Sequence, residues 1–201
     1  MIKIVLATNN AHKVSEFNNC FREKGIEAEI IPISATGFSG EIIEDADTFE
    51  GNAYIKAKAL CDYTGMISVA DDSGLVVDAL DGAPGVFSAR YAGEDCSDAD
   101  NIEKLLSELS KLPDADRSAR FVCSICVCRP DGETLTVSAF GGEGEIIDEC
   151  RGDGTFGYDP VFYYPPMGKT YAEMTSEEKN SVSHRGLAIE KLLKNKEFFE
   201  I

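Results

Sequence analysis

The chain has 201 residues, 43% hydrophobic and 27% charged, a composition typical of one globular domain that can bury a core. Its formal net charge of −17 argues against a protein that binds nucleic acid or an anionic membrane surface. No apolar run approaches the roughly 18 residues that span a bilayer, and the first residues lack a signal-peptide pattern. We therefore expect a cytoplasmic protein with neither nucleic acid nor membrane among its partners.

Strand and helix patterns alternate in the first half of the chain. One helical segment carries Val14, Phe17 and Phe21 and ends near Gly25, and a second, alanine-rich segment ends near Leu60. Short apolar runs rich in β-branched residues predict buried strands around these helices, at residues 2–7, 28–33 and 66–70.

Two adjacent acids follow the third of these strands, in the sequence Ala70-Asp71-Asp72-Ser73-Gly74, and we expect the strand to end there. Neighbouring carboxylates repel each other unless a cation or a shared proton relieves them. One interpretation is a site for a hard metal ion at the edge where α/β proteins bind ligands. The other is a solvated turn, because acids beside glycine are common in turns.

The turn Thr8-Asn9-Asn10-Ala11-His12-Lys13 joins the first strand to the first helix. Free N–H groups and the positive end of the helix dipole suit such a turn to an anion. Asparagines at helix starts are also explained as caps.

The alanine-rich helix carries Lys56 on the same face as Asn52, four residues before it. A lysine among alanines either reaches out to solvent or is placed for a function. At the start of this helix, Asp47 followed three residues later by Glu50 predicts a capping box.

The second half of the chain predicts a helix after Ser97 or Asp98 and a last helix opened by Ser183-His184-Arg185. Strand patterns flank Pro130-Asp131-Gly132-Glu133, a hairpin signal that makes part of the sheet antiparallel. We find no internal repeat or linker, and we expect one mixed α/β domain over residues 1–201.

The seven cysteines are scattered and odd in number, which argues against a disulfide framework. Cys123 and Cys126 have C-x-x-C spacing, but in a strand they point to opposite faces. Without a second pair at zinc spacing, we expect small core residues.

The polar features together supply what hydrolysis of a nucleotide phosphate requires: a metal, cations, a carboxylate to orient water and a ring to stack on a base. The motifs that carry them are Thr8-Asn9-Asn10-Ala11-His12-Lys13, Thr48-Phe49-Glu50-Gly51-Asn52-Ala53, Ala70-Asp71-Asp72-Ser73-Gly74-Leu75, Gly82-Ala83-Pro84-Gly85, Ser88-Ala89-Arg90-Tyr91, Phe156-Gly157-Tyr158-Asp159-Pro160 and Ser183-His184-Arg185-Gly186. In this order, over nearly the whole chain, they resemble the inosine triphosphate pyrophosphatase family.

The resemblance implies a long mixed central sheet flanked by helices, an active site in a central cleft, and a homodimer. It also implies Mg²⁺-dependent hydrolysis of the non-standard purine nucleotides ITP, dITP and XTP to the monophosphate and pyrophosphate. Glu44 and Asp72 would serve the metal, and Asp72 would also be the catalytic residue. The residues implied to bind substrate are Thr8, Asn9, Asn10, Ala11, His12, Lys13, Lys56, Ser73, Phe156, Gly157, Tyr158, Asp159, Lys179, His184 and Arg185.

The role of Asp72 has two interpretations. A carboxylate bound directly to Mg²⁺ is a poor base, so either Asp72 faces the water while Glu44 carries the metal, or the metal itself acidifies the water. We favour the first. Many members of the family have a second acid where this chain has Ile43, which leaves the number of metal ions and the roles of Asp45 and Asp71 open.

Base selection is expected to follow from hydrogen bonding. The 6-keto oxygen of hypoxanthine accepts from Lys179 or Arg185, whereas the 6-amino group of adenine does not, so we expect discrimination against ATP. Two rival functions are a nucleotide-binding module without turnover and a phosphatase with an aspartyl nucleophile. The second needs acids one residue apart, whereas Asp71 and Asp72 are adjacent and leave a strand in opposite directions.

Overall fold

The computed structural model describes residues 2–153 and 156–199, without the side chains of His12, Ser176 and Asn180. The chain divides into two compact units, and each is made of separate segments. Unit 1 comprises Met1–Asp72, Cys123–Ala139 and Leu187–Ile201, and unit 2 comprises Ser73–Val122 and Phe140–Gly186. The expectation of one domain over residues 1–201 stays a prediction.

The strands pair in the order β2-β1-β3-β4-β6-β7-β8 across the described residues, with β5 on β4. Strand β1 is parallel to β2 and β3, whereas β6 is antiparallel to β4 and β7, so the sheet is mixed, as predicted. The strands are β1 Ile2–Leu6, β2 Ala28–Pro32, β3 Ile67–Val77, β4 Ser118–Cys128, β5 Thr134–Phe140, β6 Gly144–Ile146, β7 Phe162–Tyr164 and β8 Lys169–Thr170.

Helices connect and cover these strands. The α-helices of the described chain are α1 Ala11–Glu23, α2 Phe49–Thr64, α3 Asp98–Ser110, α4 Ser176–Val182 and α5 His184–Leu193. Short 3₁₀ helices lie at Ile33–Thr36, Asp78–Leu80, Gly85–Arg90, Pro165–Met167, Tyr171–Glu173 and Lys196–Phe199. No helix in residues 2–153 and 156–199 is both long and apolar enough to cross a membrane.

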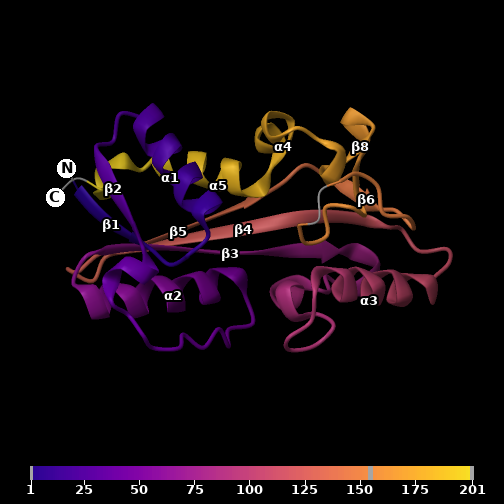
Figure 1. Ribbon diagram of the computed structural model, residues 1–201, viewed down its shortest axis with the longest axis horizontal. Helices are drawn as coiled ribbons and strands as arrows, with labels where there is room; N and C mark the ends of the chain where they lie inside the picture. The colour runs from indigo at the N-terminus through magenta and orange to yellow at the C-terminus, as the bar shows by residue number, and fades with distance from the viewer. Residues whose placement is uncertain (1, 154–155, 200–201) are drawn as a thin grey trace. The chain divides into compact units, whose positions relative to one another are not determined.

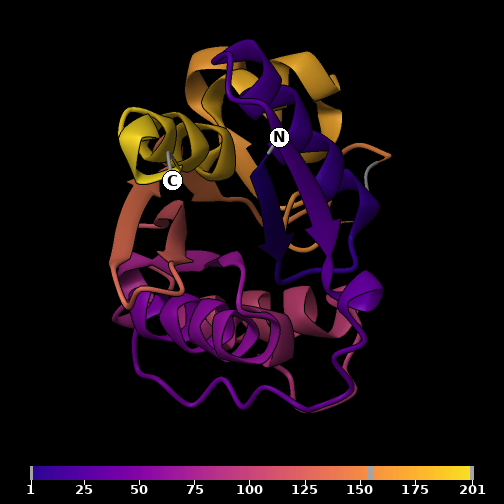
Figure 2. The same ribbon diagram turned by 90° about the vertical axis from the view of Figure 1, so that its left-hand side faces the viewer.

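Unit 1 is layered, with α2 on one face of its strands and α1 and α5 on the other (Figures 1 and 2). The α2 face is lined by small side chains, Ala53, Ala57 and Cys61, which pack on Cys126 and Cys128 of β4. Small residues let the helix approach the strands closely, because protein interiors are close-packed. The other face is a larger cluster of leucine, isoleucine, valine and phenylalanine side chains from β1, β3, β4, α1 and α5.

Unit 2 has its own core, in which α3 packs against Leu75 and Val77 of β3 and the first residues of β4 (Figure 1). Ser97 is the N-cap of α3, and Asp100 closes a capping box with it. Burying the apolar stripe of α3 stabilises this unit, since each fully buried leucine contributes about 1.5–3 kcal/mol.

The prediction that the third strand ends at its two acids is wrong. Strand β3 continues through Asp71, Asp72, Ser73 and Gly74 to Val77, and its first and last residues are buried. The strand accommodates both acids because each forms an ion pair with a different lysine. Asp71 pairs with Lys13, and Asp72 pairs with Lys56. The two acids therefore lie in the middle of a strand and not in a turn.

The predicted Asp47 cap of α2 is also wrong. Thr48 is the N-cap, and its hydroxyl accepts from the N–H of Gly51 at 3.0 Å. Glu50 does not close a box with it; its carboxylate accepts a hydrogen bond from Ser138 on β5. This bond lowers the pKa of Glu50, although burial opposes the shift.

We expect the stabilising effect of the Ser138 hydroxyl to depend on pH. Because the pKa of Glu50 is lowered in the folded chain, this contribution is present above the ordinary glutamate pKa of about 4.3 and is lost as the pH falls through the folded value. Ser138→Ala should lower the free energy of unfolding by about 1 kcal/mol at pH 7, and less at pH 3. Urea unfolding across this range measures the difference, with Ser110→Ala, whose hydroxyl bonds a backbone carbonyl, as control. A difference that is constant with pH would contradict the assignment.

Cys123 and Cys126 were predicted to be core residues that point to opposite faces of a strand, and both predictions are confirmed. Cys123 belongs to the larger cluster of unit 1, whereas Cys126 belongs to the α2 cluster, so the two thiols point to opposite faces of β4. All seven cysteines are free thiols.

Candidate active site

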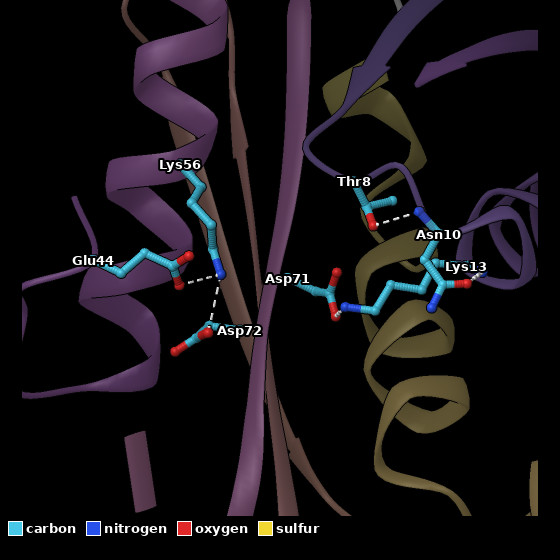
Figure 3. A network of polar contacts seen from close by, with 7 residues as sticks. All are labelled: Thr8, Asn10, Lys13, Glu44, Lys56, Asp71 and Asp72. Carbon is cyan, nitrogen blue, oxygen red and sulfur yellow. Dashed lines mark hydrogen bonds and ion pairs between the residues drawn. The ribbon is translucent and has the colours of Figure 1, made fainter. Parts of the chain in front are cut away.

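Strand β3 sends its two acids to opposite sides of the sheet, as predicted. Figure 3 shows Asp71 pointing toward α1 and Asp72 pointing toward α2. Successive residues of a strand face opposite ways, so adjacent carboxylates supply two separate groups of polar side chains. We call these the Asp72 group (Glu44, Asn52, Lys56 and Asp72) and the Asp71 group (Thr8, Asn10, Lys13 and Asp71).

Lys56 lies at the centre of the Asp72 group. Its ammonium donates to Glu44 Oε2 at 2.6 Å and to Asp72 Oδ1 at 3.0 Å (Figure 3). The lysine side chain is only 13% exposed, so it is held in the protein and does not reach out to solvent. Burial lowers its pKa, but the charges and hydrogen bonds of Asp72 and Glu44 outweigh burial, and the pKa of Lys56 is raised.

Asp72 is half-buried beside that ammonium. Burial raises the pKa of its carboxyl group, and the charge of Lys56 and the hydrogen bonds from Lys56 and Asn52 act against the increase. A carboxylate with a raised pKa accepts a proton more readily than an ordinary aspartate, as a general base must.

The Asp71 group lies at the start of α1. Lys13 Nζ donates to Asp71 Oδ2 at 2.7 Å, and the Asp71 side chain is 2% exposed. Asn10 caps the helix, because its side-chain oxygen accepts from the N–H of Lys13 at 3.3 Å and its own N–H donates to Thr8 Oγ1 at 3.1 Å. The capping interpretation therefore holds for Asn10, and Lys13 places a cation at the first turn of α1.

Removing Lys13 should destabilise the chain, since it leaves a buried carboxylate without this cation. We expect Lys13→Met to lower the free energy of unfolding by about 2–4 kcal/mol, below the full effect of a wholly buried pair because the lysine is partly exposed. Adding Asp71→Asn should recover part of the loss. Urea unfolding measures both, with Lys58→Met as control, because Lys58 pairs with Asp62 on the exposed face of α2. Equal losses for Lys13→Met and Lys58→Met would contradict the prediction.

Unit 2 holds a third polar group, which we call the Lys179 group (Phe156, Asp159, Lys179 and Arg185). Lys179 donates to Asp159, and its ammonium lies 5.5 Å from the centre of the Phe156 ring. Phe156 is 61% exposed, whereas Asp159 is buried. Burial raises the pKa of Asp159, while the charges of Lys179 and then Arg185 oppose the increase.

Three further residues that were predicted to bind substrate, Gly157, Tyr158 and His184, each contact another residue of unit 2. The Tyr158 hydroxyl donates to the Ser88 carbonyl at 2.8 Å, and its ring is buried in the core. Gly157 N–H donates to the Asp98 carboxylate at 2.7 Å. The His184 ring stacks on Phe121 with centroids 5.0 Å apart.

Comparison with known proteins decides the family. The sequence model of the Ham1 family matches residues 4–195. The chain belongs to the Ham1 family.

Relatives of known name agree with this. The chain is 46% identical over 194 residues to the dITP/XTP pyrophosphatase of Bacillus subtilis, a match that covers 96% of each chain. It is 50% identical to the dITP/XTP pyrophosphatase of Geobacillus kaustophilus, over 96% of this chain and 93% of the relative. The HAM1 protein of Coxiella burnetii has the same fold, with a TM-score of 0.90 and 43% identity over 96% of this chain and 98% of that one. The resemblance to inosine triphosphate pyrophosphatases is thereby confirmed.

The Asp72 group of this Ham1 protein contains two carboxylates, the kind of ligand that a hard divalent cation binds. Glu44 Oε2 and Asp72 Oδ1 are hard oxygen donors, and both contact the Lys56 ammonium, at 2.6 and 3.0 Å. Within the described residues no three histidine, cysteine or acidic side chains are placed to hold an ion. Two carboxylates nevertheless fit Mg²⁺, which uses one or two carboxylates and completes its shell with water and substrate phosphates.

Other predicted residues are placed as follows. Asn9 lies before α1, where its side-chain oxygen accepts from the N–H of Ser34 at 3.0 Å, and Ala11 is the first residue of α1. Ser73 follows Asp72 on β3. The side chain of His12 lies outside the described part of the chain.

A cavity of about 380 Å³ occurs elsewhere in unit 1, between α2 and the β4–β5 turn, and none of the predicted site residues lines it.

Sequence reasoning assigned no site role to Asn52 and left the role of Asp71 open. The helical spacing of Asn52 and Lys56 was the available signal for the first, and both side chains do contact Asp72. The signal for the second was only its position beside Asp72.

Proposed function

We propose that this chain hydrolyses the non-standard purine nucleoside triphosphates ITP, dITP and XTP to the monophosphate and pyrophosphate. The relatives that match it over nearly its whole length carry the name dITP/XTP pyrophosphatase. The observation that carries the proposal is the Asp72 group, in which two carboxylates contact one half-buried lysine. Such a group suits a metal-assisted reaction on an anionic phosphate chain.

The phosphate chain is assigned to residues of unit 1. Lys56 and Lys13 supply positive charge to the non-bridging oxygens, and the turn before α1 supplies backbone N–H groups and a helix N-terminus. Glu44 would hold Mg²⁺, which neutralises phosphate charge when bound, while Asp72 faces the water. In a protein with a net charge of −17, such local positive charge is needed to admit a triphosphate.

The chemical step is assigned to Asp72. Its carboxylate accepts a proton from a water molecule, the water oxygen bonds to the α-phosphorus, and the bond to the bridging oxygen breaks. Pyrophosphate leaves with the electron pair of that bond. The raised pKa of Asp72 supports this role, because such a carboxylate accepts a proton more readily than an ordinary aspartate.

The base is assigned to the Lys179 group. Phe156 presents an exposed ring for stacking, and Lys179 and Arg185 are donors that fit the 6-keto oxygen of hypoxanthine or xanthine. That this group and the two groups of unit 1 act on the same nucleotide, in a central cleft, stays a prediction.

A panel of nucleoside triphosphates with Mg²⁺ tests the function. We expect pyrophosphate and monophosphate from ITP, dITP and XTP, and little product from ATP. Binding without pyrophosphate release would favour a non-catalytic module, and orthophosphate as the product would favour a phosphatase. The opposite directions of Asp71 and Asp72 count against an aspartyl phosphatase, whose two acids share one site.

We also propose Mg²⁺ as the physiological metal, a homodimer as the assembled form and the cytoplasm as the location. The hard oxygen donors of Glu44 and Asp72 support the metal. Seven free cysteines support a reducing compartment. The dimer is supported by the family resemblance alone, and light scattering of the purified protein measures it.

A further inference from the structure

In the proposed function, Lys56 contacts phosphate, Glu44 serves the metal and Asp72 serves the water. Asn52 is the remaining member of the Asp72 group and has no role yet. It lies on the first turns of α2 and is 1% exposed. Its side-chain oxygen accepts from the N–H of Ala46 at 3.0 Å, and its side-chain nitrogen donates to Asp72 Oδ2 at 3.3 Å. A buried amide with both ends bonded fixes the two groups that it joins.

The two partners of Asn52 are the two halves of the candidate metal and water site. Ala46 belongs to the irregular segment before α2 that carries Glu44, two residues earlier. Asp72 belongs to β3, and its other oxygen is bonded by Lys56. Asn52 thus holds one carboxylate directly and the other through the backbone of its loop.

We propose that Asn52 is a positioning residue that sets the Asp72 carboxylate in register with the Glu44 loop. This inference rests on the proposed pyrophosphatase function. Asn52 touches neither substrate nor metal in this scheme; it acts through Asp72 and the loop. Outer-shell groups of this kind orient the groups that do the chemistry.

Two substitutions separate the two bonds of Asn52. Asn52→Asp keeps an acceptor for Ala46 but replaces the donor to Asp72 by a second carboxylate, whereas Asn52→Leu removes both bonds. We expect both variants to lower kcat for ITP by about 10–100-fold, as for other outer-shell groups. The KM should stay within about threefold of wild type, because the lost interaction is not with the substrate.

Asn101 provides the matched control. It is also a buried helical asparagine, and its oxygen accepts from Ala92 N–H at 2.8 Å while its nitrogen donates to the Ala89 carbonyl at 3.3 Å. The Cys96 thiol also donates to its oxygen, at 3.2 Å, and none of these partners is an acid. Asn101→Asp and Asn101→Leu should therefore leave kcat within about threefold of wild type, at a temperature where each variant is folded.

The contact itself is tested without turnover, by a cycle of unfolding temperatures. Asn52→Asp should unfold about 3–6 °C lower than wild type, and the double variant Asn52→Asp with Asp72→Asn should regain much of this, because donor and acceptor are exchanged. Strong coupling together with the loss of kcat supports the proposal. Additive unfolding temperatures, or an Asn52→Asp variant with kcat within threefold of wild type, overturn it. A wild-type chain inactive on ITP would refute the proposed function instead, and the cycle would still decide whether Asn52 positions Asp72.

Discussion

Asp72→Asn should lower kcat for ITP by about 10²–10⁴-fold, the usual range for removal of a general base, while Mg²⁺ affinity stays near that of wild type. The amide is almost the same shape as the carboxylate and keeps an oxygen toward Lys56, but it cannot take a proton from water. Single-turnover kinetics and calorimetric Mg²⁺ titration measure the two quantities. In the wild type, kcat/KM should fall as the pH drops through the pKa of Asp72, which burial raises above that of an ordinary aspartate.

Asp71→Asn is the matched control for this prediction. It makes the same chemical change one residue earlier, on the opposite side of β3. Since Asp71 contacts Lys13, we expect it to change KM for the triphosphate more than kcat. Loss of Mg²⁺ binding in Asp72→Asn would contradict the assignment of Asp72 as the base and would indicate that Asp72 binds the metal directly. Equal loss of kcat in both variants would show that the strand, and not one carboxylate, was disturbed.

Lys179→Met should reduce the preference of the enzyme for ITP over ATP. If Lys179 donates to the 6-keto oxygen, its loss costs about 1–3 kcal/mol for ITP, or roughly 5–150-fold in kcat/KM, and far less for ATP. The methionine side chain keeps most of the apolar length of lysine, so packing beside Phe156 and Tyr171 changes little. Competition assays with both nucleotides in one reaction give the ratio directly.

Lys169→Met controls for the loss of a lysine in unit 2. Lys169 pairs with Glu178 at 2.8 Å, in a more exposed setting than the pair of Lys179 with Asp159. We expect the ITP to ATP ratio of Lys169→Met to equal that of wild type. An unchanged ratio in Lys179→Met would leave Arg185 as the donor to the base.

Local signals predicted much of the fold. The first helix ends at Glu23 and is followed by Gly25 at φ +72°, the left-handed conformation that the glycine was expected to supply. Ser97 and Asp100 cap α3 where a cap was predicted, and α5 begins at His184. In each case the signal and the element are within a few residues of each other.

The failures involve partners that are distant in the sequence. Acids beside a glycine favour a turn locally, but β3 continues through them in the interior of the sheet, where the fold pairs them with Lys13 and Lys56. Likewise, Glu50 bonds a serine 88 residues away and leaves the cap to Thr48. The same limit applies to the site: Asn52 could be placed on the face of Lys56, but not between Asp72 and the backbone of Ala46.

The alternation of Asp71 and Asp72 on β3 restricts how this gene segment can change length. Inserting or deleting one codon between Ile67 and Ala70, with the rest of the strand in register, would rotate every following side chain to the other face. Asp72 would then lie on the side of Lys13, and Asp71 would lie on the side of Lys56. This stretch can therefore accept point substitutions during evolution, whereas the insertion or deletion of a single residue would exchange the partners of both acids.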